Sequence, residues 1–215
     1  MSDVLALPRE RPLRVLALGA HADDLEIGCG GTVARLLEER PDSRVTWVVL
    51  SGEPARAAEA RASAAALLGP AAARIALLEG RDGFLPYEAG ATKDALLQLR
   101  EEPGPDLVLT HRREDLHQDH AFAAQLAWQV FRSARIVEFE VPKYEGDLGP
   151  ANLYVPLARP LAAGKVDGLM THFKSQQAHD WFTAETFWAL LRLRGLECRA
   201  PSGYAEAFTC RKLVA

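Results

Sequence analysis

Short apolar runs alternate with helical segments along most of this chain, and this alternation is the feature that most limits its fold. Residues 13–18 form a short apolar run without polar alternation, which is typical of a strand buried on both faces. Residues 44–50 are rich in β-branched side chains, and both runs are followed by apolar positions at helical spacing. Four successive strand-then-helix units predict an α/β fold. We expect a Rossmann-like, mostly parallel sheet with helices on both faces.

The same patterns predict approximate element boundaries. The predicted strands are residues 13–18, 44–50, 74–78, 106–110 and 135–141, with further strands at 152–156 and 205–212 that complete the sheet. The predicted helices are residues 32–39, 53–68, 92–101, 120–131, 160–177 and 184–194, and residues 82–90 are expected to form a loop. Because no repeat, low-complexity tract or linker interrupts the chain, we expect residues 1–215 to form a single domain.

Composition excludes several classes of partner. The chain has 215 residues, of which 48% are hydrophobic, enough to bury a full core. A net charge of −4 argues against nucleic acid or an anionic membrane as the main partner. No apolar stretch approaches the roughly 18 residues of a membrane span, and the first ten residues lack the features of a signal peptide. We therefore expect a soluble, cytoplasmic protein. The sequence leaves the oligomeric state open, a homo-oligomer included.

Cysteine usage adds little to the prediction. The three cysteines, Cys29, Cys198 and Cys210, are odd in number and form no CxxC pair. Neither a disulfide framework nor a thiolate zinc site is therefore indicated.

Directly after the first apolar run, the segment His21–Asp24 presents one imidazole and two carboxylates. In open α/β sheets, ligands bind at the carboxyl ends of the strands. A tight turn lets His21 and Asp24 face one ion, as in catalytic zinc sites with three protein ligands. Asp23 is then placed beside the metal as a general base. The alternative is that Asp23 or Asp24 only caps the next helix.

A second cluster, His117–His120, follows the strand predicted at 106–110. Its two imidazoles are three residues apart and share a face if a helix begins here, so one can bind a metal while the other faces a substrate. The alternative is a polar helix start capped by Asp119, with exposed histidines. Right-handed crossovers bring both clusters to the same edge of the sheet, which favours a shared metal.

Several motifs resemble those of the PIG-L/LmbE-like N-acetylglucosaminyl deacetylases, and they occur in the family's order. His21–Asp24, with Glu26 and Gly30–Thr32, is similar to the opening HxDDxExxxGG motif, and Asp115–His120 is similar to the DxHxDH motif. Other stretches that resemble the family are Ser51–Glu53 with Arg56 and Glu59, His172–Gln176, and Ala205–Phe208.

The resemblance implies a zinc-dependent hydrolase that removes the N-acetyl group from an amino-sugar conjugate of the N-acetylglucosamine type. It makes His21, Asp24 and His120 the ligands of one Zn²⁺ per chain, with another divalent metal as an alternative. Asp23 becomes the general base. The small-molecule partner is then an N-acetylated amino sugar whose aglycone the sequence does not identify.

The resemblance also makes His117 the residue that stabilises the oxyanion or protonates the leaving amine. We expect a cationic His117 to balance the charge of the tetrahedral intermediate. Asp115 or Asp119 is expected to orient an imidazole by hydrogen bonding. The chain departs from the family in two places: Ala22 stands where proline is frequent, and no tyrosine lies near His117 to help hold the oxyanion.

Three residues are expected at the substrate: Arg56, Glu59 and His172. Arg56 can contact a sugar hydroxyl or a phosphate with Glu59 as its partner, and the alternative is a structural or surface pair. Other candidates for specificity or stacking are the rim segments 81–82 and 143–145 and the aromatic residues Trp181 and Trp188, which are otherwise core residues.

Other readings of the same residues remain open. In one alternative the substrate is a different amide. In another the chain is a metal-dependent sugar-binding protein without turnover. An iron(II) oxygenase also uses two histidines and one carboxylate. The strand–helix alternation and the carboxylate of Asp23 beside the metal favour hydrolysis.

Overall fold

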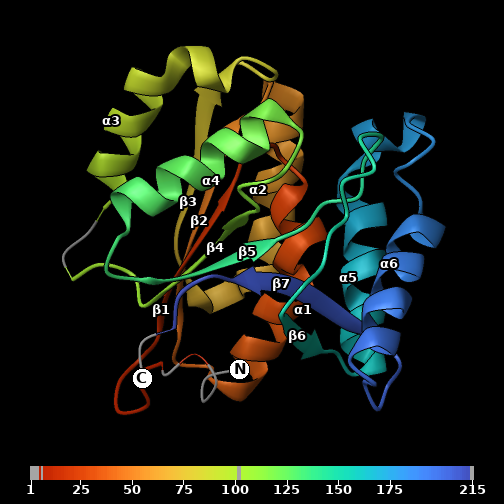
Figure 1. Cartoon of the computed structure of the whole chain (residues 1–215). Coiled ribbons are helices and arrows are strands. Elements are labelled where there is room, and N and C mark those ends of the chain that lie inside the picture. The colour runs from red at the N-terminus through yellow and green to blue at the C-terminus, as the bar shows by residue number, and fades with distance from the viewer. Residues whose placement is uncertain (1–4, 6, 101–102, 214–215) are drawn as a thin grey trace.

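The computed structural model describes residue 5, residues 7–100 and residues 103–213, and these form a seven-stranded sheet between two layers of helices (Figure 1). The order of the strands is β3-β2-β1-β4-β5-β7-β6. Strands β1 to β5 are parallel to one another, and β7 runs antiparallel to both of its neighbours, β5 and β6. The predicted α/β fold with a mostly parallel sheet is therefore confirmed. The strands are Arg14–Gly19 (β1), Arg44–Ser51 (β2), Ala72–Gly80 (β3), Leu107–His111 (β4), Arg135–Phe139 (β5), Leu153–Pro156 (β6) and Ala205–Cys210 (β7).

Each face of the sheet has its own hydrophobic core. One core joins the sheet to α1 and α2, with α5 and α6 packed farther out, and the other joins the opposite face to α3 and α4 (Figure 1). The predicted strands thus have helices on both faces. The helices are Asp24–Glu39 (α1), Pro54–Leu68 (α2), Ala89–Leu99 (α3), Gln118–Val130 (α4), Arg159–His172 (α5) and Ala184–Glu197 (α6).

Helix α1 begins at Asp24, eight residues before the predicted start at residue 32. The prediction was wrong because glycines 28, 30 and 31 resemble a loop in sequence. In the structure Gly28 and Gly31 allow close packing instead. A Cβ atom at Gly28 would lie 2.1 Å from the Phe139 ring, and one at Gly31 would lie 2.4 Å from Leu157.

A buried ion pair lies against the middle of α1. The Glu206 carboxylate accepts hydrogen bonds from the backbone N–H groups of Gly31 and Thr32, at 2.9 and 2.6 Å. Lys165 Nζ donates to the carbonyl oxygen of Ile27 and to Glu206, both at 2.5 Å. Gly31 N and Ile27 O are the donor and acceptor of one helical turn. The pair therefore joins α1 to β7 and α5 at one turn.

Other boundaries differ by smaller amounts. Helix α3 begins at Ala89, after a 3₁₀ turn at Leu85–Glu88 inside the predicted loop, and the predicted last residue, Glu101, lies outside the described residues. The helix predicted at 160–177 ends at His172 and is followed by a 3₁₀ turn, Lys174–Ala178. Strand β7 lies inside the sheet between β5 and β6.

The three cysteines, and the tryptophans considered for stacking on a sugar, are buried or half-buried in the fold. Cys29 is buried and the other two cysteines are half-buried, and all three are free thiols. Trp181 and Trp188 pack against the core under α5 and α6, in agreement with the core alternative. Among the described residues, none of the helices has the length and apolar character needed to cross a membrane.

Candidate metal centre

Both histidine clusters lie at the carboxyl edge of the sheet, where the chain order of the strands reverses between β1 and β4. His21 follows β1, and His117 directly precedes α4, which follows β4. Helices that leave two adjacent strands toward opposite faces open a crevice between them, the usual ligand position in such sheets. Residues almost a hundred positions apart are thereby brought into contact.

Ligand atoms of His21, Asp24 and His120 converge at this point. Nδ1 of His21 lies 3.1 Å from Nε2 of His120 and 3.4 Å from Oδ2 of Asp24. Nε2 of His120 lies 3.4 Å from the other oxygen of Asp24. Nitrogen or oxygen ligands at about 2.0–2.2 Å from a tetrahedral zinc ion lie roughly 3.3–3.5 Å from one another. Each pair of side chains, with Asp24 contributing a different oxygen to each imidazole, therefore has the separation of neighbouring ligands of a small divalent cation.

On each of the imidazoles of His21 and His120, the ring nitrogen that does not face the shared point lies next to a carboxylate. Nε2 of His21 lies 3.1 Å from Asp119 and 3.1 Å from Asp82, and Nδ1 of His120 lies 3.1 Å from Asp115. A carboxylate behind a histidine fixes the tautomer and orientation of a metal ligand. The structure thus brings Asp115 and Asp119 to the positions expected from the sequence. Asp82, which was assigned to the rim, also reaches His21.

Backbone and lysine contacts fix these carboxylates in turn. Asp119 accepts hydrogen bonds from the backbone N–H groups of Gly83 and Leu85, at 2.7 and 3.1 Å, and is fully buried. Asp115 forms an ion pair with Lys143 at 3.0 Å. The loops after β3 and β5 are therefore tied to the centre.

The buried charges shift the pKa values of the converging groups. Burial alone would raise the pKa of Asp24, but the imidazoles of His120, His111 and His21 hold it well below its usual range. Burial opposes protonation of His120, yet Asp24 and Asp115 raise its pKa to about 9. The centre thus carries carboxylates that stabilise positive charge between them.

Asp23 is buried and directed toward Arg56. Its side chain makes no capping hydrogen bond to α1, so the capping alternative for Asp23 is not seen. Instead, Oδ1 of Asp23 accepts a hydrogen bond from Nη2 of Arg56 at 3.0 Å. Burial and the charge of Asp24 raise the pKa of Asp23, and Arg56 opposes that rise. A carboxylate with a raised pKa is suited to accept a proton near neutral pH.

His117 is the N-cap of α4. Its Nδ1 accepts a hydrogen bond from the backbone N–H of Asp119 at 3.3 Å, which leaves the proton on Nε2. The ring centroid lies 4.9 Å from that of His21 and 4.6 Å from that of His120. Burial, and then the charges of His120 and His21, lower the pKa of His117. The structure therefore favours a neutral ring that donates from Nε2, in place of the cationic ring expected from the sequence.

His111 also belongs to this centre, and the sequence interpretation missed it. It is fully buried at the end of β4, with Nε2 3.0 Å from the backbone nitrogen of Ala20 and 3.1 Å from Oδ2 of Asp24. Its ring stacks on that of His120 with centroids 4.0 Å apart. Burial and the charge of His120 lower the pKa of His111 to about 4, so the ring is neutral. The available signal was its place directly after a predicted strand.

The structure separates the three residues expected at the substrate. Arg56 bonds Asp23 and Asp82, whereas Glu59 accepts from the backbone N–H and hydroxyl of Ser175, at 2.9 and 2.6 Å. The predicted pairing of Arg56 with Glu59 is therefore wrong, because each side chain reaches a different partner. His172 is the last residue of α5 and lines a cavity between α1, α2 and α5.

A family model agrees with the resemblance that the sequence motifs indicated. A family model described as "PIG-L: GlcNAc-PI de-N-acetylase" matches residues 16–131. This region runs from within β1 to the end of α4 and contains the histidines and carboxylates of the centre, whereas Lys143 lies beyond it.

Solved structures share the fold over nearly the whole chain. A conserved protein of Thermus thermophilus is 23% identical with a TM-score of 0.74, covering 94% of this chain and 96% of that chain. The N,N'-diacetylchitobiose deacetylase of Pyrococcus horikoshii is 22% identical with a TM-score of 0.71, and the match covers 98% of this chain and 89% of that chain. The 4-carboxy-2-hydroxymuconate hydratase GalB of Pseudomonas putida is 18% identical with a TM-score of 0.67, and the match covers 94% of this chain and 98% of that chain. The names give different reactions, so these matches support the fold and not one activity.

Proposed function

This chain belongs to the PIG-L family, and on that premise we propose that it is a metal-dependent hydrolase that removes the N-acetyl group from an amino-sugar conjugate of the N-acetylglucosamine type. The observation that supports this proposal most is the convergence of His21, Asp24 and His120 within 3.4 Å, with Asp23 next to Asp24 in the chain. A binding protein needs no additional buried carboxylate beside its metal.

We propose that His21, Asp24 and His120 hold one Zn²⁺ or another divalent cation. A bound divalent cation would act as a Lewis acid on the amide carbonyl. The carboxylates of Asp115 and Asp119 orient the two imidazoles so that one nitrogen of each faces the same point.

Asp23 is the general base of this proposal. Its carboxylate takes a proton from the attacking water, and its raised pKa brings it nearer to working pH. Arg56 holds the carboxylate through Oδ1, so the other oxygen is the one that remains to accept the proton. Asp23 can later return that proton to the leaving amine.

His117 is the hydrogen-bond donor for the oxyanion in this proposal. Because its Nδ1 accepts from the backbone, its Nε2–H is the group that can donate to an oxygen in the crevice. A neutral donor needs no proton uptake before it acts. No tyrosine is required for the role that the family often gives to that residue.

We propose that the substrate enters over the loops after β3 and β4, where Asp82 has a half-exposed side chain and His117 is half-buried. Arg56 lies at this entrance and is the best placed of the three expected substrate residues. Glu59 would act indirectly, because it holds the turn at Ser175. His172 is assigned to the substrate only through the resemblance.

The experiment that tests the proposal measures amine release from a panel of N-acetylglucosamine conjugates, using metal-free protein and protein loaded with zinc. Metal-dependent release of glucosamine conjugates is expected. The absence of release from every conjugate, with metal bound at one equivalent, would exclude the acetyl-sugar substrate. Release from other acetamides would then identify the alternative amide.

A matched variant separates turnover from binding. Asp23→Asn is expected to keep the metal and lower kcat by about 10²–10⁴-fold, the usual contribution of a general base. A metal-dependent sugar-binding protein would bind its sugar equally well with either residue. Metal analysis of the purified protein distinguishes zinc from the iron of an oxygenase.

A further inference from the structure

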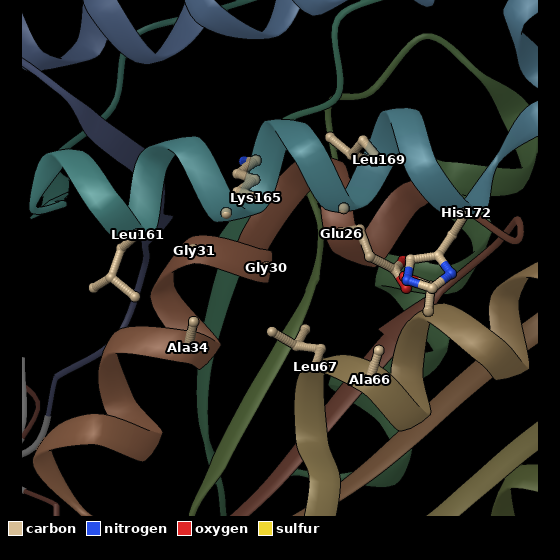
Figure 2. A pocket seen from close by; sticks show the side chains of 13 residues that line it. Glu26, Gly30, Gly31, Ala34, Ala66, Leu67, Leu161, Lys165, Leu169 and His172 are labelled. Atoms are coloured by element: carbon tan, nitrogen blue, oxygen red, sulfur yellow. The ribbon is translucent and has the colours of Figure 1, made fainter.

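A second cavity lies outside the metal centre, between α5 and the pair α1 and α2 (Figure 2). Its volume is about 270 Å³, slightly below the ~300 Å³ at which sites for drug-sized ligands begin. Glycine, alanine and leucine form most of its walls. The polar residues in the lining are Glu26, Ser63, Lys165 and His172.

Glu26 is the polar group without an assigned partner in this cavity. The residue is 6% exposed, and neither carboxyl oxygen has a hydrogen-bond partner of acceptable geometry among the described residues, although the hydroxyl of Ser63 lies nearby. Figure 2 places Glu26 and His172 at one end of the cavity and Leu161 at the other. A buried polar group without a partner is costly, and it indicates a missing ligand or water.

The other buried charge in the lining is already satisfied. Lys165 Nζ is bonded to the carbonyl oxygen of Ile27 and to Glu206. Lys165 therefore contributes its methylene chain to the wall, and its ammonium group is not available to a ligand. The cavity thus has one polar end and an apolar body.

Two glycines of α5, Gly164 and Gly168, line the cavity. A Cβ atom built at Gly164 or at Gly168 would meet nothing within 4 Å. By contrast, Gly31 on the opposite wall could not accept a Cβ without contacting Leu157 at 2.4 Å. Gly164 is exposed and Gly168 is half-buried, so these two glycines leave the α5 wall of the cavity without side chains.

We propose that this cavity binds a small amphipathic molecule, with an aliphatic body along Gly164 and Gly168 and a hydroxyl or ammonium head that donates a hydrogen bond to Glu26. A carboxyl group accepts such a bond whatever the charge of the head, whereas an acidic head would face the Glu26 carboxyl while the Lys165 ammonium is already engaged. The site is separate from the metal centre and does not depend on the proposed deacetylase activity.

Three six-carbon probes test this proposal on the full, metal-loaded chain: hexan-1-ol, hexylamine and hexanoate. Amide resonances of α1, α2 and α5 are followed by NMR as each probe is added. Hexan-1-ol or hexylamine is expected to shift these resonances with a roughly millimolar Kd, which suits a ligand of this size. Hexanoate is expected to leave them unchanged. The relative affinity of the two donors identifies the neutral or the charged head.

Variants locate the binding. Gly168→Leu fills the cavity and is expected to weaken the donor probes at least tenfold. Gly90→Leu is the matched control, because its Cβ on α3 also meets nothing within 4 Å. It should change the Kd by less than twofold. Glu26→Met, which removes the acceptor, is expected to weaken hexan-1-ol or hexylamine and to abolish their advantage over hexanoate.

The proposal is overturned if neither donor probe shifts these resonances up to its solubility limit. It is also overturned if hexanoate binds as well as hexan-1-ol, or if Gly168→Leu binds like the unaltered chain. Shifts that appear only near His21 and His120 would assign the binding to the metal centre. Melting temperatures show whether each variant is folded, and Gly164→Leu replaces Gly168→Leu if the latter is not.

Discussion

Nη2 of Arg56 donates a hydrogen bond to Oδ1 of Asp23 over 3.0 Å, while Nη1 of the same guanidinium bonds Asp82 at 2.9 Å. The first turn of α2 thus holds a carboxylate at the start of α1, and it also reaches the loop after β3. Asp23 makes no capping bond to its own helix, so Arg56 is the main fixed point of its side chain. Arg56 is therefore a positioning residue for the proposed base.

Replacing this arginine is expected to affect turnover more than substrate affinity. In Arg56→Met the charge that opposes the raised pKa of Asp23 is lost, so the pKa of Asp23 rises further. The acid limb of kcat/KM then moves to higher pH, and kcat at neutral pH falls about tenfold or more, part of what a general base contributes. Metal content stays at that of the unaltered chain. The measurement is a pH–rate profile of both proteins.

Arg61→Met, on the exposed side of the same helix, is the control and should leave the profile unchanged. If Arg56→Met instead raises KM with the same kcat and the same acid limb, then Arg56 acts on the substrate and not on Asp23.

His111 is expected to support the metal by fixing the backbone just before His21. Its Nε2 accepts a hydrogen bond from the backbone N–H of Ala20 at 3.0 Å and lies beside Asp24, and its ring packs between His120 and Phe139. His111→Ala removes the hydrogen bond and the ring packing, and His111→Phe removes both ring nitrogens but keeps an aromatic ring. Loss of a group that orients a metal ligand typically weakens metal binding about 10–100-fold. We expect both variants to show this loss in competition with a chelator. Recovery of full affinity in His111→Phe would mean that the ring acts only by packing.

More of the fold than of the candidate metal centre could be predicted from the sequence. Strand β1 and the other parallel strands have apolar or β-branched runs, and these local patterns placed them within two residues of their boundaries. The start of α1 could not be found, because the reason for Gly28 and Gly31 lies in Phe139 and Leu157, more than a hundred residues away. The position of β7 inside the sheet depends on pairing that no local pattern encodes.

The candidate centre shows the same division. The motifs that resemble a known family led to His21, Asp24 and His120, and the structure brings these together. His111 was missed because a single histidine after a strand is no motif. The partner of Arg56 was assigned wrongly because helical spacing favoured Glu59, whereas the fold brings Asp23 within reach.

The ion pair of Lys165 and Glu206 is expected to be essential for stability. Both side chains are almost fully buried and engage the backbone of α1 at one turn. Lys165→Met leaves the carboxylate of Glu206 buried without its cation, which typically costs about 3–5 kcal/mol. The double variant Lys165→Met with Glu206→Gln removes both charges. Its loss, measured by urea unfolding, should be smaller than the sum of the two single losses. Additive losses would show that the two charges do not interact.

Glu26 is expected to make stability depend on pH in a direction opposite to that of most acidic residues. Burial raises its pKa from 4.5 to about 8, with smaller increases from Asp23 and Asp24, while the hydroxyl of Ser63 opposes the rise. Between these pH values the folded chain keeps a proton that the unfolded chain has lost. The stabilisation is therefore complete below about pH 4.5 and is lost as the pH rises through 8, by up to about 1.4 kcal/mol per pH unit.

Glu26→Gln has no proton to lose, so its free energy of unfolding should exceed that of the unaltered chain by an amount that grows from pH 5 to pH 8. Glu38→Gln, on the exposed side of the same helix, is the control and should show no such growth. Urea unfolding at several pH values, at equal metal content, measures the difference. A constant difference across this range would mean that Glu26 is already ionised in the folded chain. An ionised Glu26 would then favour a cationic ligand in the cavity. In the NMR titration of the unaltered chain, hexylamine would accordingly bind more tightly than hexan-1-ol.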